Sequence, residues 1–260
     1  MSTRCTGRSP VSHPDAPAAA GAPPGMRRRA DGPSRLLDIY RALDERYRDD
    51  VWHWMPDVAR GPFDVIAGAI LVQHTAWDNA ERALDALRAA GALDPAELLA
   101  RPLDEIEQLV RVSGMPRMKA ARLRAVAATI AAVGGLDALL ALPAAELRER
   151  LLATRGIGPE TADAIVLYAA GRPAFVIDAY TRRTFGRLGL RPDDEGYDGW
   201  QRMFVDGLGE AGSVELYQRF HGHIVLHAKD VCRATPRCAP CPLLARCVDG
   251  RARIDEAAAR

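Results

Sequence analysis

The stretch "ELRERLLATRGIGPETADAIVLYAA", residues 146–170, decides the fold, because it indicates two helices joined by a very short turn. The turn is Arg155-Gly156-Ile157-Gly158, and its glycines permit positive φ and let another backbone approach closely. Ile157, between them, can pack into the groove between the helices. Pro159 suits the first turn of the second helix. The stretch therefore predicts a helix–hairpin–helix.

Two interpretations of this turn stay open on the residues alone. Any hairpin of two helices can need glycines simply to turn tightly. The unpaired N–H groups at the start of the second helix would also suit a phosphate oxygen, and phosphate contacts fix the register of a protein on DNA without reading its sequence. On this second interpretation, the DNA-binding residues are Arg155, Gly156, Ile157, Gly158 and Thr161.

The rest of the chain indicates helices almost throughout. Apolar residues recur at helical spacing in "RLLDIYRALDERY" (35–47), whereas "FDVIAGAILVQ" (63–73) is apolar nearly all round and is expected to be buried. Only "AFVI" (174–177) suggests an extended crossing, and no Asn-Gly or Asp-Gly turn stands between alternating strands. We therefore predict an all-α fold.

Composition excludes several classes of protein. With 48% hydrophobic and 27% charged residues and a net charge of +1, the chain is ordinary for a globular protein, so a DNA-binding surface would be local. No apolar run reaches the roughly 18–20 residues of a membrane span, and the N-terminus lacks the apolar region of a secretory signal. We expect no membrane partner and a cytoplasmic, nucleoid-associated location. Residues 1–33, rich in Pro, Ala, Gly and Arg, are expected to form a disordered tail.

A single acid, Asp178, ends the apolar run "AFVI" and opens the next helix. Capping that helix would be sufficient reason for an Asp at this position. The apolar run, however, carries this residue toward the interior, where an ionised carboxylate is costly without a purpose. The two roles are compatible, since capping would also keep the carboxylate ionised and oriented. Asp178 is therefore our candidate catalytic residue.

These residues resemble a known family. "LLATRGIGPETADAIVLYAAGRPAFVIDAYTRR" (151–183) resembles the helix–hairpin–helix, Gly/Pro-rich loop and catalytic Asp of the endonuclease III superfamily of DNA glycosylases, and the resemblance covers roughly residues 36–247. It implies a base-excision repair enzyme acting on double-stranded DNA that contains damaged bases, and we expect a monomer. Asp178 would lie beside the sugar of a flipped nucleotide, where it stabilises an oxocarbenium-like state or orients the attacking water.

The resemblance also implies two helical lobes that flank a DNA-binding cleft. We place a six-helix lobe that ends in the hairpin motif at residues 55–171. The first helix (34–50) and residues 172–250 would form the second lobe, which holds the cysteine cluster and is followed by a C-terminal tail at 251–260.

Glu160 is a departure from the bifunctional members of the superfamily, which carry a Lys two residues after the last glycine of the turn. A carboxylate cannot form the imine that lyase chemistry requires. The only lysines of the chain, Lys119 and Lys229, lie elsewhere, so we predict a monofunctional glycosylase. Glu160 could also attract a cationic alkylated base into the pocket. An equal explanation is that it faces solvent or caps an N–H in the first turn of its helix.

Gln73, in "AILVQHTAWDNAERAL", matches a family Gln that enters the hole left by the flipped base. Flipping costs a few kcal/mol, and an inserted amide can recover hydrogen bonds to the orphaned partner base. A polar residue that caps a buried helix is the alternative. The runs "QHTAW" and "VIDAYTRR" are most similar to the 3-methyladenine glycosylase subgroup, which has Tyr two residues after the Asp, here Tyr180.

Four further residues are candidates with ordinary alternatives. Trp52 and Trp54 could stack with the base, although a Trp pair in a loop can equally plug the core beneath it. Lys119, together with Arg117, would lie at a helix start near the opposite DNA strand, where a solvated basic turn is the competing explanation.

Four of the five cysteines crowd into "CRATPRCAPCPLLARC". Four thiolates in one loop can hold a [4Fe-4S] cluster or a tetrahedral zinc, but structural zinc usually uses two Cys-x2-Cys pairs and only one is present. The segment resembles the C-terminal cluster loop of endonuclease III-like glycosylases, with a first gap of five residues where six is common. This implies a [4Fe-4S] cofactor with the ligands Cys232, Cys238, Cys241 and Cys247. The loop arginines Arg233, Arg237 and Arg246 would suit phosphates or balance the cluster's charge.

The function that we favour is hydrolysis of the glycosidic bond of an alkylated purine. One alternative is a glycosylase for oxidised pyrimidines or mismatches that retains lyase activity. Another is a non-catalytic protein that binds DNA damage while keeping the fold and the cluster.

Overall fold

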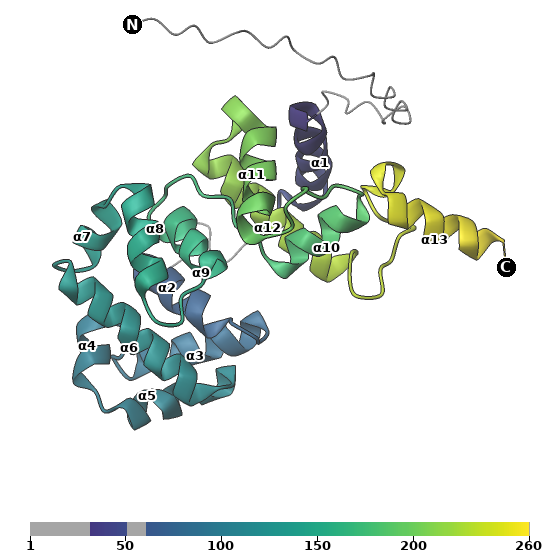
Figure 1. Ribbon diagram of the computed structural model, residues 1–260. Coiled ribbons are helices and arrows are strands. Elements are labelled where there is room, and N and C mark those ends of the chain that lie inside the picture. The colour runs from purple at the N-terminus through teal and green to yellow at the C-terminus, as the bar shows by residue number, and fades with distance from the viewer. Residues whose placement is uncertain (1–31, 51–60, 260) are drawn as a thin grey trace, which may run out of the picture. The chain divides into compact units, whose positions relative to one another are not determined.

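The computed structural model describes residues 32–50 and 61–259, with side chains from residue 35 onward. Every regular element in these residues is helical and no strand occurs among them, which confirms the all-α prediction (Figure 1). Within the same residues, no helix combines the length and the apolar character that crossing a membrane would require.

Helix α2 (Pro62–Leu71) forms the centre of one group of helices. Eight of its ten residues are buried, as its apolar sequence predicts. It packs against α3 (Trp77–Ala89), α6 (Pro116–Ala132) and α9 (Pro159–Ala164). The other helices of this group are α4 (Pro95–Ala100), α5 (Leu103–Leu109), α7 (Leu136–Ala141) and α8 (Ala144–Ala153).

Helix α12 (Val214–Asp230) is the centre of a second group. It packs against α1 (Gly32–Tyr47) and α10 (Ala179–Arg187), and α11 (Tyr197–Leu208) packs against α1. Helix α13 (Val248–Ala258) contacts α10. Aromatic rings with centroid distances of 4.1 to 6.0 Å fill the space between α10, α11 and α12: Phe175, Phe185, Phe204 and Phe220.

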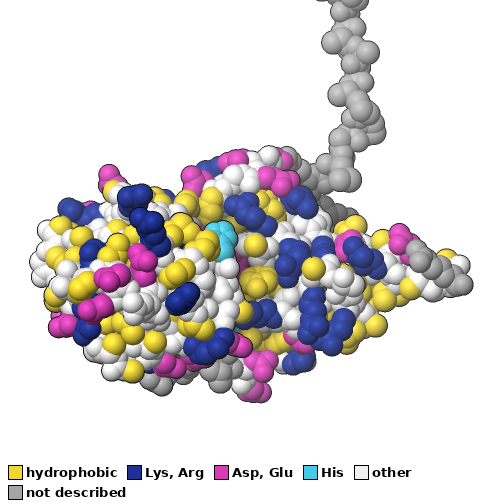
Figure 2. Space-filling model, turned by 90° about the horizontal axis from the view of Figure 1, so that it is seen from below, with side chains coloured by type: hydrophobic (Ala, Val, Ile, Leu, Met, Phe, Trp, Pro, Cys, Tyr) yellow, Lys and Arg dark blue, Asp and Glu magenta, His cyan; other side chains and the backbone are white. Residues whose placement is uncertain are grey.

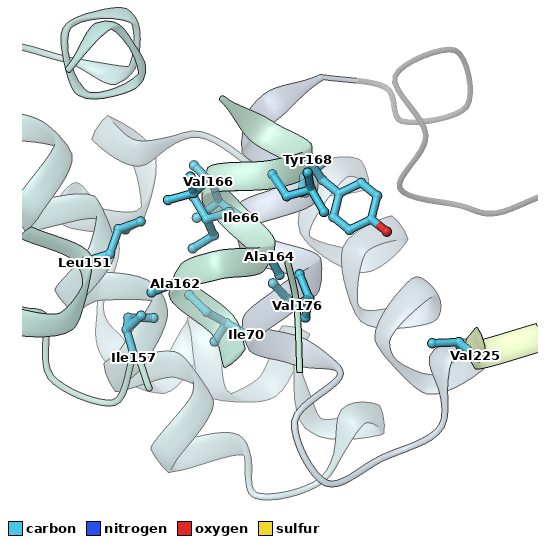
Figure 3. Close-up of a cluster of buried hydrophobic side chains, with 14 of the residues drawn as sticks. Ile66, Ile70, Leu151, Ile157, Ala162, Ala164, Val166, Tyr168, Val176 and Val225 are labelled. Carbon is cyan, nitrogen blue, oxygen red and sulfur yellow. The ribbon is translucent and has the colours of Figure 1, made fainter. Parts of the chain in front are cut away.

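The hairpin's second helix takes part in both groups. After Ala164 the chain continues as one π-helical turn, Ile165–Ala169, whose residues contact both α2 and α12. Figure 3 shows Val166 from this turn in one apolar cluster with Ile66 and Ile70 from α2. Because the chain then runs extended to the start of α10, one core positions both the hairpin and the residue that caps α10.

Some boundaries differ from those predicted. Helix α7 is not evident from the sequence, and α2 to α9 occupy the lobe for which six helices are expected. Residues 251–258, predicted as a tail, continue α13. Apolar spacing does not reveal this helix, because Gly250 is its one buried residue. The predictions for residues 1–31 lie outside the described residues.

Candidate active site and DNA interface

The predicted hairpin is present as α8, a short turn and α9. Gly156 has φ 88°, and a Cβ atom there would lie 2.5 Å from Cγ of Arg122, so glycine is required at this position. Gly158 is exposed, and nothing lies within 4 Å of where its Cβ would be. The first glycine is therefore needed by the turn itself, whereas the second leaves open space in front of the backbone.

Ile157 closes the turn from inside. Its side chain is 5% exposed and lies near Leu151 and Ala162 (Figure 3), and its amide donates to the carbonyl of Thr154 at 3.1 Å. The side chain and the amide of Ile157 therefore both make contacts within the protein. Ile157 supports the turn from inside, whereas the sequence predicted a direct contact with DNA. Arg155, the residue before the glycines, is exposed.

Gln73, predicted to enter the DNA, is hydrogen-bonded to the hairpin. Its Nε2 donates to Oγ1 of Thr161 at 3.0 Å and to the carbonyl of Gly156 at 3.5 Å, and its Oε1 accepts from Nη1 of Arg122. The next residue, His74, is exposed and has φ 57°, a backbone conformation that residues other than glycine adopt infrequently. The structure thus brings Gln73 and the glycine turn together through Arg122, a residue not evident from the sequence.

Helix α10 begins as predicted, with Asp178 as its N-cap. The side chain is 8% exposed, and Oδ1 accepts from the amide of Thr181 at 2.6 Å while Oδ2 faces Nε2 of His221 at 3.7 Å. Burial raises the pKa of Asp178, but the interactions with His221 and the Thr181 amide outweigh it and hold the pKa below its ordinary value. The carboxylate is therefore ionised at neutral pH, as stabilisation of a positive charge requires.

A buried polar network holds the extended segment that leads to Asp178. Nε2 of Gln201 donates to the carbonyl of Phe175 at 2.9 Å and to Oδ2 of Asp163 at 2.8 Å. The hydroxyl of Tyr197 accepts from the amide of Ile177 at 3.3 Å. These contacts fix the backbone just before the candidate catalytic residue.

Asp163 carries the charge of this network and is fully buried. Arg148 binds it through both carboxylate oxygens, at 2.7 and 3.3 Å, and so links α8 to α9 across the hairpin. Burial and then the charge of Asp163 raise the pKa of Tyr197, so its hydroxyl stays protonated. Sequence reasoning missed all three residues, and the lone acid within the apolar run 162–168 is the one pattern that could have revealed them.

Glu160 is the second residue of α9 and is exposed. Desolvation of the carboxyl by the surrounding protein is the largest effect that raises the pKa of Glu160, followed by the negative charge of Asp178. The positive charges of His221 and Arg182 oppose the shift. Glu160 lies at the start of α9, and Asp178 is the N-cap of α10. Two neighbouring carboxyls with pKa values shifted in opposite directions are typical of sites that cleave glycosidic bonds.

The aromatic candidates have different outcomes. Tyr180, the second residue of α10, is half-buried, and the guanidinium carbon of Arg183 lies 5.1 Å from the centre of its ring. Tyr180 therefore has one face against the protein and part of its surface accessible close to Asp178. Trp52 and Trp54 lie outside the described residues.

The prediction that Lys119 contacts DNA is wrong. Its side chain is fully buried, and Nζ donates to the carbonyls of Leu71 at 2.7 Å and Ser113 at 2.5 Å. Burial, followed by the charge of Arg122, lowers the pKa of Lys119 to about 8. Lys119 joins the last residue of α2 to the 3-10 turn Arg111–Ser113 that precedes α6, from inside the protein. Arg117, two residues earlier, is exposed.

The four clustered cysteines line one pocket. All four are free thiols. Nη1 of Arg187 donates to Sγ of Cys232 at 3.3 Å, and the amide of Gly250 donates to Sγ of Cys247 at 3.2 Å. Across the ranges that the structure describes, no three Cys, His, Asp or Glu side chains form a site for a single metal ion. Four thiols are the number of ligands that a [4Fe-4S] cluster or a tetrahedral zinc uses.

Basic side chains gather over the part of the molecule that carries α10 and the cysteine segment (Figure 2). Some of them hold the segment itself. Arg237 forms an ion pair with Asp230 at 2.7 Å, and Arg233 donates to the carbonyl of Lys229 at 2.9 Å. Both guanidinium groups nevertheless belong to exposed residues.

Comparison with known proteins decides the family. A family model described as "HhH-GPD superfamily base excision DNA repair protein" matches residues 67–207, which include the hairpin and Asp178 and amount to more than half of the chain. The chain belongs to the HhH-GPD superfamily. The polar networks described above thus surround the hairpin and the aspartate of a base-excision DNA repair protein.

Relatives and solved structures agree with this assignment. The chain is 36% identical over 216 residues to a provisionally named DNA repair glycosylase of Methanocaldococcus jannaschii, covering 82% of this chain and 96% of that one. It is similar to an endonuclease III bound non-covalently to DNA, with TM-score 0.73 and 23% identity, covering 85% and 98% of the two chains. It is also similar to the H. pylori 3-methyladenine DNA glycosylase bound to 1,N6-ethenoadenine, with TM-score 0.65 and 28% identity over 75% and 97%. The resemblance to the endonuclease III superfamily and the all-α architecture are confirmed.

Proposed function

We propose that this HhH-GPD protein is a monofunctional DNA glycosylase that hydrolyses the glycosidic bond of an alkylated purine. The observation that carries the proposal is a buried Asp178 carboxylate that caps α10, together with Glu160 at the position where lyase members carry lysine. Neither group can form an imine, so the chemistry that they support is hydrolysis rather than strand cleavage.

Asp178 does its work on the sugar. As the bond from C1′ to the base nitrogen breaks, its electrons leave with the base and positive charge develops on the sugar. The free edge of the Asp178 carboxylate stabilises that charge and orients the water that adds to C1′. Because the other oxygen is held by the Thr181 amide, the carboxylate needs no reorganisation during the step.

Glu160 favours a cationic base. Alkylated purines carry a formal positive charge, and an exposed carboxylate beside Asp178 adds to the negative potential that attracts them. Replacing Glu160 by Gln should slow release of 3-methyladenine, while release of a neutral base such as 1,N6-ethenoadenine changes less. Equal rates for the variant and the parent on 3-methyladenine would remove this electrostatic argument.

The hairpin binds the DNA backbone in this proposal. Arg155 and the open space before Gly158 suit a phosphate, and Thr161 together with Gly156 holds Gln73 until DNA displaces it. Gln73 then enters the space left by the flipped base. Replacing Arg155 by Gln should weaken binding to damaged and undamaged duplexes alike, measured by fluorescence anisotropy, because phosphate contacts carry no sequence information.

The cofactor in this proposal is a [4Fe-4S] cluster held by Cys232, Cys238, Cys241 and Cys247. The shared cavity and the N–H groups directed at two of the sulfurs support it. When bound, the cluster would link four positions of the segment rigidly to one another. Protein purified without oxygen should contain about four iron and four sulfide per chain, whereas one zinc per chain would contradict the proposal.

A panel of damaged duplexes tests the function. Duplexes carrying 3-methyladenine, thymine glycol or a mismatch are incubated with the protein, and base release is scored before and after hot alkali. We expect release of 3-methyladenine with strand breaks only after alkali. Strand breaks without alkali would favour a glycosylase with lyase activity, and binding without release of any base would favour a damage-binding protein.

A further inference from the structure

His221 is a buried titratable group that the proposed mechanism does not use. It lies on α12, is 2% exposed and is placed between two polar groups from other elements. Its Nε2 faces Oδ2 of Asp178 at 3.7 Å, and its Nδ1 lies 2.8 Å from the hydroxyl of Tyr168. Figure 3 shows the Tyr168 hydroxyl pointing away from the apolar cluster that holds the rest of its helical turn.

The proton inventory of this chain of contacts limits the state of His221. The Tyr168 hydroxyl has one proton, which it can donate to Nδ1 of His221 at 2.8 Å or to the carbonyl of Gln218 at 3.0 Å. Gln218 lies inside α12, where its carbonyl also faces the amide one turn later, so it does not depend on Tyr168. If Tyr168 donates to Nδ1, the ring proton of a neutral His221 is on Nε2, directed at Asp178. If Tyr168 donates to Gln218 instead, a ring protonated at both nitrogens also directs its Nε2–H at Asp178. A neutral ring protonated at Nδ1 would instead turn a lone pair toward the carboxylate.

We propose that His221 is a positioning residue for Asp178, with Tyr168 holding the imidazole as the Nε2–H form that faces the catalytic carboxylate. This inference rests on the catalytic role proposed for Asp178. The fold supplies a rigid mount for it, since Tyr168 comes from the turn after α9, His221 from α12 and Asp178 from the start of α10. Both α10 and that turn pack against α12.

The other groups near the pair do not replace His221. Glu160 from α9 adds negative charge, and Arg182 from α10 donates to the carbonyl of Glu195 at 2.8 Å. Besides His221, the group that keeps the pKa of Asp178 low is Thr181. Removing the imidazole should therefore raise the pKa of Asp178, because burial would then meet less opposition.

Substitutions at His221 test the role through the pH dependence of base release. In His221→Leu, the acid limb of single-turnover release should move to higher pH by about one unit, because the buried carboxylate loses the imidazole 3.7 Å from Oδ2. His221→Gln offers an N–H to Asp178, so its acid limb should lie close to that of the parent protein. The matched control is His223→Gln on the same helix, whose ring pairs with Asp44 at 3.1 Å, and its acid limb should stay in place. An unmoved acid limb in His221→Leu would overturn the inference.

Long-range ¹H–¹⁵N spectra of the full chain test the same inference without any activity. They should identify His221 as protonated at Nε2 at neutral pH, and this preference should weaken in Tyr168→Phe. A neutral ring protonated at Nδ1 in the parent protein would overturn the proposal even if every variant failed to fold. Failure of the parent to release any base would count against the proposed function instead, while these spectra still decide the state of His221.

Discussion

Two buried aspartates, Asp163 and Asp178, differ in how completely their carboxylate oxygens are bonded within the protein. Asp163 is fully buried, and its oxygens receive Arg148 twice and Gln201 once. Asp178 keeps 8% of its surface exposed, has one oxygen on a single amide and the other facing His221 at 3.7 Å. The first carboxylate is saturated by a cation and an amide, whereas the second still has room for a developing charge.

This difference shows what to look for in a buried acid. A guanidinium that binds both carboxylate oxygens neutralises the charge, so the carboxylate stabilises the fold and cannot stabilise a charge that develops on a substrate. A carboxylate held by one amide stays ionised and oriented, yet its field acts on whatever enters beside it. By this criterion we propose that Asp163 belongs to the scaffold and Asp178 to the reaction, and variants of each should separate stability from activity.

Asp178→Asn should have the largest effect on activity. Asn is as good an N-cap as Asp, so the loss of stability at neutral pH should be limited to the contribution of the carboxylate charge. The neutral amide cannot stabilise the sugar cation, and single-turnover base release should fall by at least about 10²–10³-fold. A loss of stability comparable to the loss of activity would contradict the assignment of Asp178 to the reaction.

Asp163→Asn should show the reverse pattern. It leaves Arg148 without its counter-charge, which should lower the free energy of unfolding by about 2–4 kcal/mol, near the lower end for buried pairs because Arg148 is partly exposed. Urea unfolding measures this loss. Base release per folded molecule should fall less than in Asp178→Asn; an equal or larger fall would make Asp163 part of the reaction.

Glu160→Lys sharpens the comparison from the side of the second carboxyl. It places an amine beside Asp178 at the position where bifunctional relatives carry lysine. We expect a covalent adduct with a lesion-containing duplex that borohydride traps, while the parent protein and Glu160→Gln give none. Trapping by the parent would contradict the monofunctional assignment.

The smallest expected effect concerns the dependence of stability on pH. The folded-state pKa of Asp178 lies below the ordinary pKa of an aspartate, so its contribution to stability is present above that ordinary pKa and lost as the pH falls through the folded pKa. Asp178→Asn should therefore lose less stability than the parent in this acid range. The Glu160 pKa is shifted the other way, so Glu160→Gln should be more stable at neutral pH, by less than about 1 kcal/mol because the residue is exposed. If the free energy of unfolding depended on pH in the same way for all three proteins between pH 2 and 7, the pKa shifts of both Asp178 and Glu160 would be contradicted.

Local sequence patterns were sufficient for the hairpin and for Asp178. A short turn with two glycines, a proline at a helix start and an acid that caps the next helix are determined by neighbouring residues, and the structure confirms them. The same holds for the apolar helix α2, whose composition alone indicates burial. These features needed no knowledge of distant contacts.

Long-range contacts decided what the sequence could not predict. Lys119 and Arg117 are both basic residues at a helix start, but only Lys119 is directed at the carbonyls of Leu71 and Ser113, so one is buried and the other exposed. His221 lies 43 positions from Asp178 in the chain, and nothing in its helix distinguishes it from His223. Partners that come from other helices give no periodic pattern within one helix.

The most direct test of the account is single-turnover release of 3-methyladenine from a duplex by the parent protein, Asp178→Asn and Asp163→Asn, each scored for base release and for strand breaks before alkali. The account predicts release without strand breaks by the parent, little release by Asp178→Asn and substantial release by folded Asp163→Asn. Equal release by the parent and Asp178→Asn would contradict it.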